Sequence, residues 1–119
     1  MEDEYLNLVR LLNEANVEYV VLGGHAVIAH GYYRTTGEFE VADFTLVPNF
    51  LSFSRYDGWI DLMTFTVGVT FDECYQNRIE LELDGTKIKF INLPELIKNK
   101  IALGRPQDLQ DLENLMGNV

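Results

Sequence analysis

The chain has 119 residues, with 9 Lys and Arg against 19 Asp and Glu, and a formal net charge of −10. This length fits one domain, residues 1–119, with a core of its own. No apolar run approaches the ~20 residues that cross a bilayer, and the acidic start Met1-Glu2-Asp3-Glu4 is unlike a secretory signal. We therefore expect a cytoplasmic protein with no membrane association.

The charge also limits the partners. Non-specific binding to nucleic acids requires many Lys and Arg residues at phosphates, so a long nucleic acid is disfavoured. A nucleotide carried by a divalent cation, or a basic protein, remains compatible with an acidic chain. The single Cys74 cannot form an internal disulfide, which agrees with a reducing compartment, and a buried structural cysteine is favoured over a catalytic thiol.

The first half of the chain alternates helix and strand signals. Helical spacing of apolar residues predicts a helix over 2–15, and the β-branched run 17–22 predicts a buried strand. Gly23-Gly24 forms the next turn, a short helix follows over 25–30, and a strand is predicted over 38–47, where Pro48 ends it.

The second half begins with predicted strands at 50–54 and 59–65, around a turn at 56–58, and a short helix at 71–76. The alternating runs 78–83 and 87–91 flank Asp84-Gly85, which indicates a hairpin. Asn92 caps a helix that ends at Gly104, and Pro106 opens the last helix. We expect two apolar stripes on these helices, Leu93, Leu96, Ile97 and Ile101 on the first and Leu109, Leu112 and Met116 on the second. The expected fold is α/β (α+β), a mixed β-sheet with packed helices.

Gly23-Gly24 is the first candidate for chemistry. Glycines allow a phosphate to approach the backbone closely, and the following helix start offers free N–H groups. On its own, a tight structural turn is the more economical explanation.

Three acidic residues could hold a metal. Glu38 and Glu40 are two apart on a predicted strand, so they share a face, and carboxylates are the ligands that Mg²⁺ or Mn²⁺ takes beside phosphates. Asp61 lies within the apolar strand Trp59-Ile60-Asp61-Leu62-Met63, where a carboxylate needs a partner or an ion. A solvated strand face for the glutamates, and a backbone-bonded carboxylate for Asp61, are the alternatives.

Four polar residues could contact phosphates. Lys100 lies at the edge of an apolar stripe, where it either extends to solvent or reaches into a cleft. Arg105 precedes the last helix, and Arg34 with Thr35 precedes the acidic strand. A surface loop is the alternative for residues 34 and 35, and Asp108 is well placed as a simple helix-dipole partner.

Three blocks together resemble the nucleotidyltransferase superfamily with the DNA polymerase β-like fold, and in particular its small bacterial members, the minimal nucleotidyltransferases and the transferases of abortive-infection toxin–antitoxin systems. The blocks are VEYVVLGGHA (17–26) with HGYYRTTG (30–37), WIDLMT (59–64), and LPELIKNK (93–100) with GRPQDLQDL (104–112). The resemblance implies that Glu38 and Glu40 stand at the metal-binding acid pair and Asp61 at the third acid. It also implies that Lys100 and Arg105 contact nucleotide phosphate or pack against the site.

Two features depart from that family. The acid pair is normally aspartate, and glutamate is one methylene longer, which the strict Mg²⁺ octahedron tolerates poorly. The family also places a helical crossover between the two acidic strands, whereas the segment from Glu40 to Asp61 has no room for a helix. Either the crossover and the aspartates have been lost, or a further segment that carries them belongs between Gly37 and Glu38.

Two functions follow from the resemblance. The first is a metal-dependent transfer of a nucleoside monophosphate from a nucleoside triphosphate to a hydroxyl acceptor. The second is a catalytically degenerate module that acts as an antitoxin-like or regulatory partner of another protein. In the second case the aromatic residues are candidates for the interface, namely Tyr32, Tyr33, Phe50, Phe53 and Trp59.

Overall fold

The computed structural model describes residues 3–43, 50–55, 58–63 and 67–117. The elements follow the predicted order, with boundaries that move by a few residues at most wherever both ends are described. They are α1 (Asp3–Glu14), β1 (Tyr19–Leu22), α2 (Gly23–Ala29), β2 (Glu38–Asp43), β3 (Phe50–Arg55), β4 (Gly58–Met63), α3 (Phe71–Gln76), β5 (Ile79–Leu83), β6 (Thr86–Phe90), α4 (Leu93–Leu103) and α5 (Pro106–Met116).

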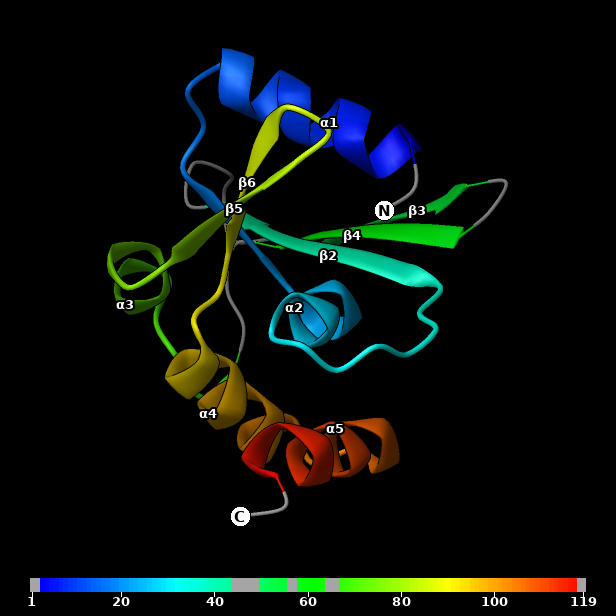
Figure 1. Ribbon diagram of the computed structural model, residues 1–119, viewed down its shortest axis with the longest axis vertical. Coiled ribbons are helices and arrows are strands. Elements are labelled where there is room, and N and C mark those ends of the chain that lie inside the picture. The colour runs from blue at the N-terminus through cyan, green and yellow to red at the C-terminus, as the bar shows by residue number, and fades with distance from the viewer. Residues whose placement is uncertain (1–2, 44–49, 56–57, 64–66, 118–119) are drawn as a thin grey trace.

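The strands form one six-stranded sheet in the order β3-β4-β2-β1-β6-β5. Strand β1 is antiparallel to β2 and parallel to β6, and β2 is parallel to β4. The sheet is therefore mixed, as expected. Figure 1 shows α1 at one end of the long axis and the neighbouring helices α4 and α5 at the other, with the sheet between them.

The connection between β2 and β4 contains the strand predicted at 50–54 and departs from the pattern of the nucleotidyltransferase family. The family places a helical crossover between these parallel strands, but this chain returns through β3, an edge strand antiparallel to β4. In the sheet, β4 lies between β3 and β2. Because β4 is antiparallel to β3, the strand before it in the sequence, it runs parallel to β2. The described residues of this connection, 50–55, form a strand and no helix. The further segment between Gly37 and Glu38 stays a prediction.

The core lies between the central strands and the helices. Side chains of Tyr19 and Val21 on β1, and of Phe39 on β2, are fully buried. The ring of Phe39 stacks on that of Tyr5 from α1, with centroids 4.7 Å apart. This contact holds the first helix against β2, the strand that carries two of the candidate acids.

Local signals explain the ends of the last two helices. The Asn92 side chain accepts a hydrogen bond from the backbone N–H of Glu95, and Gly104 ends α4 in the left-handed region at φ 62°. Asp108 accepts the backbone N–H of Arg105 at the start of α5. These caps bear out the predicted helix boundaries.

The predicted apolar stripes of α4 and α5 are partly wrong. Ile101, Leu109 and Met116 are 60%, 56% and 51% exposed. The buried faces instead mix polar and apolar side chains, because charged residues of the two helices bind one another in the interior. On α4 these are Glu95, Leu96, Asn99 and Lys100, and on α5 Asp108, Asp111, Leu112 and Leu115.

Candidate functional site

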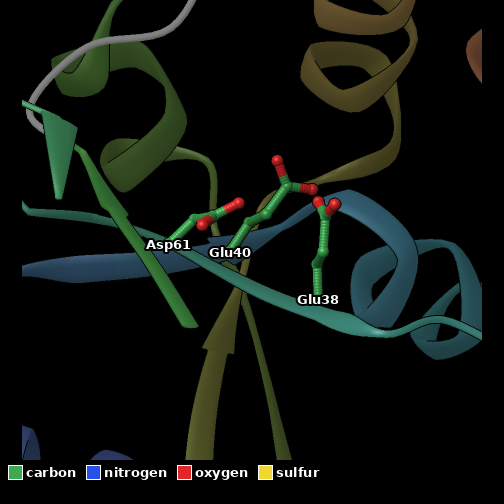
Figure 2. Close-up of side chains that lie close together, drawn as sticks. All are labelled: Glu38, Glu40 and Asp61. Carbon is green, nitrogen blue, oxygen red and sulfur yellow. The ribbon is translucent and has the colours of Figure 1, made fainter. Parts of the chain in front are cut away.

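Three carboxylates converge from two neighbouring strands. Glu38 and Glu40 share one face of β2, and Glu40 lies directly opposite Asp61 in the register of β2 with β4. Figure 2 shows the three side chains gathered on the same side of the sheet. One carboxylate oxygen from each lies within 4.8 Å of the others.

The cluster is electrostatically costly without a counterion. Asp61 is 8% exposed, Glu40 is half-buried, and Glu38 is exposed. Burial of the Glu40 carboxyl raises its pKa, the neighbouring Glu38 raises it further, and Asp61 adds to the effect. Lys100 and Arg105 act in the opposite direction on the same pKa. A cation at this position would relieve the repulsion.

The donor set fits a divalent ion. Oxygen ligands lie about 2.0–2.6 Å from Mg²⁺ or Ca²⁺, so two ligands of one ion are about 5 Å apart at most. The carboxylate oxygens already satisfy that limit. Glu38, Glu40 and Asp61 could therefore bind one divalent metal, and their all-oxygen chemistry favours Mg²⁺, Ca²⁺ or Mn²⁺ over softer ions.

Gly23 makes room for one of these acids. Its φ is +67°, and a Cβ built on it would overlap the Glu40 carboxylate. At the start of α2, the backbone of Gly23 thus lies directly against the Glu40 side chain. The glycine is required by this approach as well as by the positive φ.

Gly24 makes room for the segment that leads into β2. A Cβ there would lie 2.6 Å from Oγ1 of Thr36 and 3.0 Å from Nη2 of Arg34. Thr36 Oγ1 in turn donates to the carbonyl of Glu38 at 3.3 Å. The two glycines therefore pack the acidic strand and its preceding segment against the same turn.

A network of charges from the last two helices and the segment before β2 lies beside these acids. Lys100, with 3% of its side chain exposed, donates to Asp108 at 3.1 Å and to Asp111 at 2.8 Å. Arg34 donates to both oxygens of Asp111, at 2.7 Å from Nε and 3.0 Å from Nη2. Arg105 Nε donates to Asp108 at 2.7 Å. Lys100 is thus buried rather than extended to solvent, and Arg34 is not in a free surface loop.

The network carries more positive than negative charge. Three cations, Arg34, Lys100 and Arg105, share the two carboxylates of Asp108 and Asp111. Burial alone would raise the pKa of each aspartate, but hydrogen bonds from Arg105 and Lys100 to Asp108, and from Lys100 and Arg34 to Asp111, lower both. Both aspartates therefore remain ionised and hold the three cations in place. Because two negative charges face three positive charges, the network keeps a net positive charge.

A cleft of about 470 Å³ joins the two charged groups. Its volume lies within the range of small-molecule sites. The lining comes from the glycine turn, the segment before β2, the two glutamates and the start of α5, namely Gly24, Arg34, Thr35, Thr36, Gly37, Glu38, Glu40, Lys100, Arg105, Pro106, Gln107 and Asp108.

The structure brings the residues singled out from the sequence into one place. Gly24, Arg34, Thr35, Glu38, Glu40, Lys100 and Arg105 all line the cleft, while Gly23 and Asp61 contribute from behind it through Glu40. Whether they bind a ligand stays a prediction.

One contribution was missed from the sequence: Gln107 lines the cleft. Asp111 was expected to cluster with Arg105 and Asp108, but its position between Arg34 and Lys100 was not predicted. The available signal was the three-residue spacing of Asp108 and Asp111, which places both acids on one helix face beside Leu112.

Other polar candidates have structural surroundings. Cys74 is buried, and burial raises the pKa of its thiol to about 12, so the thiolate needed for nucleophilic chemistry is disfavoured. His30 Nε2 is hydrogen-bonded to the Ile91 carbonyl at 2.9 Å. His25 lies apart from it, edge-on to the stacked rings of Tyr5 and Phe39.

Comparison with known proteins finds a solved structure with a similar fold. No model of a known protein family matches the chain, and no curated protein sequence matches it. A solved structure is similar: the antigenic nucleotidyltransferase-like protein from Paracoccidioides brasiliensis, with a TM-score of 0.61 and 14% sequence identity, over 94% of this chain and 73% of that one. The chain has a nucleotidyltransferase-like fold. Within the described residues, no helix has the length and apolarity to cross a membrane.

Proposed function

We propose that this protein transfers a nucleoside monophosphate from a nucleoside triphosphate to a hydroxyl acceptor, with Mg²⁺ or Mn²⁺ held by Glu38, Glu40 and Asp61. The single observation that carries the proposal is the presence of two oppositely charged groups in one cleft. Glu38 and Glu40 line the cleft, with Asp61 close to both of them, and Arg34, Lys100 and Arg105 of the network with excess positive charge line the same cleft. A metal-bound triphosphate is complementary to both.

Each group has a defined task in this proposal. Arg34, Lys100 and Arg105 bind the phosphate oxygens and neutralise the charge that grows on the leaving group. Gly24 lets the phosphates approach the backbone. A bound divalent ion would supply charge neutralisation between the carboxylates and the phosphates. Most of the rate acceleration would come from positioning and electrostatics.

The reaction balances as a displacement at phosphorus. The acceptor oxygen forms a bond to the α-phosphorus, and the bond from that phosphorus to the oxygen bridging to the β-phosphate breaks. Pyrophosphate leaves with that bridging oxygen, and the hydroxyl proton passes to solvent. Because the carboxylates are mostly glutamates, we expect Mn²⁺ to be accommodated better than Mg²⁺, whose octahedron is stricter.

The test is metal binding followed through the paramagnetism of Mn²⁺. Titration of the protein with Mn²⁺ should deplete the electron spin resonance signal of the free ion. Asp61→Asn keeps the size of the side chain but removes its charge, so binding should weaken at least tenfold. Glu82→Gln, an exposed acid on β5 outside the cluster, is the matched control and should leave the titration unchanged. Equal binding by Asp61→Asn and the wild type would contradict the metal site.

The second candidate is a module without catalysis, acting as an antitoxin-like or regulatory partner of a basic protein. Tyr33 is 83% exposed and Tyr32 is 37% exposed, so both are open to an interface. The side chains of Phe50, Phe53 and Trp59 lie outside the described part of the structure. This candidate predicts a complex whose stability is unaffected by Asp61→Asn but reduced by Tyr33→Ala.

A further inference from the structure

Strand β5 ends the sheet on one side, and its outer edge is open. It pairs with β6 along residues 79–83, and in the described part of the chain no strand lies beyond it. The register with β6 runs without a break, so no bulge twists the strand away. Neither Pro nor Lys, which often block an exposed edge, occurs in the strand. The outer edge of β5 is therefore open to a further strand.

The backbone groups of Glu80 and Glu82 face this open edge. Opposite residues of an antiparallel pair exchange either two backbone hydrogen bonds or none. On β6, the carbonyl of Lys87 accepts from the side-chain amide of Asn13 at 2.7 Å, and the N–H of Lys89 donates to the hydroxyl of the β1 tyrosine at 3.4 Å. These two lysines therefore direct their backbone groups away from β5. Their partners Glu82 and Glu80 consequently direct N–H and C=O to the outer edge, where no described residue binds them.

Acidic and apolar side chains alternate along β5, so the two faces of the edge differ. Glu80 and Glu82 are exposed on one face, and Leu81 and Leu83, which are 41% and 39% exposed, lie on the other. Neither glutamate forms an ion pair with a described cation, although each lies opposite a lysine of β6. Lys89, for example, donates its ammonium group to the tyrosine hydroxyl of α3 at 3.3 Å instead. The edge thus carries two uncompensated negative charges beside partly exposed leucines.

The strand that β5 already binds shows which sequence fits it. Residues 86–90 of β6 read Thr-Lys-Ile-Lys-Phe, and they place the lysines opposite the two glutamates and the isoleucine opposite Leu81. Opposite charges and apolar pairs across two strands are stabilising, whereas like charges directly opposite are destabilising. Pairing of β5 with β5 of a second copy would place glutamates opposite glutamates, in a chain whose net charge is already −10. The edge therefore favours a basic strand over a second copy of this chain.

We propose that the outer edge of β5 binds an extended basic segment of a partner protein as an additional antiparallel strand. Lys or Arg residues of the segment lie opposite Glu80 and Glu82, and an apolar residue between them lies opposite Leu81. Backbone hydrogen bonds supply the affinity of such a contact, and the alternating side chains select the partner. The proposal does not depend on nucleotide transfer, since no residue of the carboxylate cluster or the cationic network takes part.

The test uses a peptide with the pattern of β6, acetyl-Gly-Thr-Lys-Ile-Lys-Phe-Gly-amide. It is titrated into the ¹⁵N-labelled protein, and the amide shifts of Glu80 and Glu82 should change and saturate in NMR spectra. The same peptide with glutamates in place of the lysines should bind at least tenfold more weakly, because like charges then lie opposite each other. A third peptide, N-methylated at both lysines, keeps the charges but lacks the N–H groups that face the glutamate carbonyls. It should bind at least fivefold more weakly than the first.

A pair of matched double variants tests the location. Glu80→Gln combined with Glu82→Gln should weaken binding of the basic peptide roughly fivefold, because two pairs of opposite charges are lost. Glu14→Gln combined with Glu113→Gln removes the same net charge from exposed positions on α1 and α5. This control should change the affinity less than about twofold, since long-range attraction between exposed charges is screened by salt.

Four results would overturn the proposal. Equal affinities of the N-methylated and unmethylated peptides would mean that charge alone attracts the segment. Equal effects of the two double variants would place the contact elsewhere, as would the absence of saturable shifts on β5 at millimolar peptide. Shifts of the β5 amides with protein concentration in the absence of peptide would identify a second copy of this chain as the occupant.

Discussion

The Glu40 carboxylate lies against the backbone of Gly23, so closely that no side chain fits at residue 23. The turn that follows β1 and the acid on β2 are therefore one structural unit. Leu22, the residue before the turn, is also the register partner of Glu40. The position of the acid is fixed by the strand pairing on one side and by the glycine on the other.

Gly23→Ala should displace Glu40 and weaken Mn²⁺ binding as well as destabilise the fold. Urea unfolding should show a loss of about 2–4 kcal/mol, the sum of the left-handed backbone cost and the overlap. Gly85→Ala is the matched control, since Gly85 has a φ of +75° and nothing lies within 4 Å of the added Cβ. It should lose only about 1–2 kcal/mol. Equal losses, with Mn²⁺ affinity intact in both variants, would show that Glu40 does not need the glycine.

Asp111→Asn should be strongly destabilising, because the positive charges of Lys100 and Arg34 then lose a carboxylate partner in the interior. Removal of one partner from a buried pair costs about 3–5 kcal/mol. The control is Lys98→Ala, which breaks the Lys98–Glu95 pair at a lysine whose side chain is 55% exposed. That change should cost less than about 1 kcal/mol in the same urea titration. A small loss for Asp111→Asn would mean that the network contributes little to the α4–α5 packing.

His25 should make the protein less stable in mild acid. Burial lowers the pKa of His25 from 6.5 to about 4, and the charge of Arg34 adds to this. Between those values the unfolded chain binds a proton that the folded protein does not, so the free energy of unfolding falls as the pH falls from 6.5 to 4. The loss should reach about 2–3 kcal/mol.

His25→Phe should remove the contribution of His25 to that slope in the pH range 5–6.5, whereas the contribution of Glu40, whose pKa is raised, should be the same in both proteins. Thermal unfolding at several pH values measures it. An identical pH dependence in the variant and the wild type would show that His25 is not the group responsible.

The sequence predicts the local structure well where a residue acts through its own backbone. Asn92, Gly104 and the Asp84-Gly85 turn each determine an end or a reversal that the structure confirms. Glu38 and Glu40 share a face because they are two apart on a strand, which requires no knowledge of the sheet.

The interior of the α4–α5 pair could not be predicted in the same way. Hydrophobic spacing assigned Ile101 and Met116 to the buried faces, but the interior positions hold Lys100, Asp108 and Asp111. Burial of Lys100 cannot be predicted until its partners Asp108 and Asp111 are known, and Arg34, the other cation bound to Asp111, lies far away in the chain. The strand at 50–54 was predicted, but its place at the edge of the sheet, beside β4 and away from β2, could not be derived from the local pattern.

The most direct test of the account is calorimetric titration of ATP into the wild-type protein and Asp61→Asn, each with and without Mn²⁺. We predict that the wild type binds ATP measurably only when Mn²⁺ is present, and that Asp61→Asn loses this dependence together with at least tenfold in affinity. ATP binding that is equal with and without the metal, or unchanged in Asp61→Asn, would contradict the proposal that Glu38, Glu40 and Asp61 form the metal site of a nucleotidyltransferase.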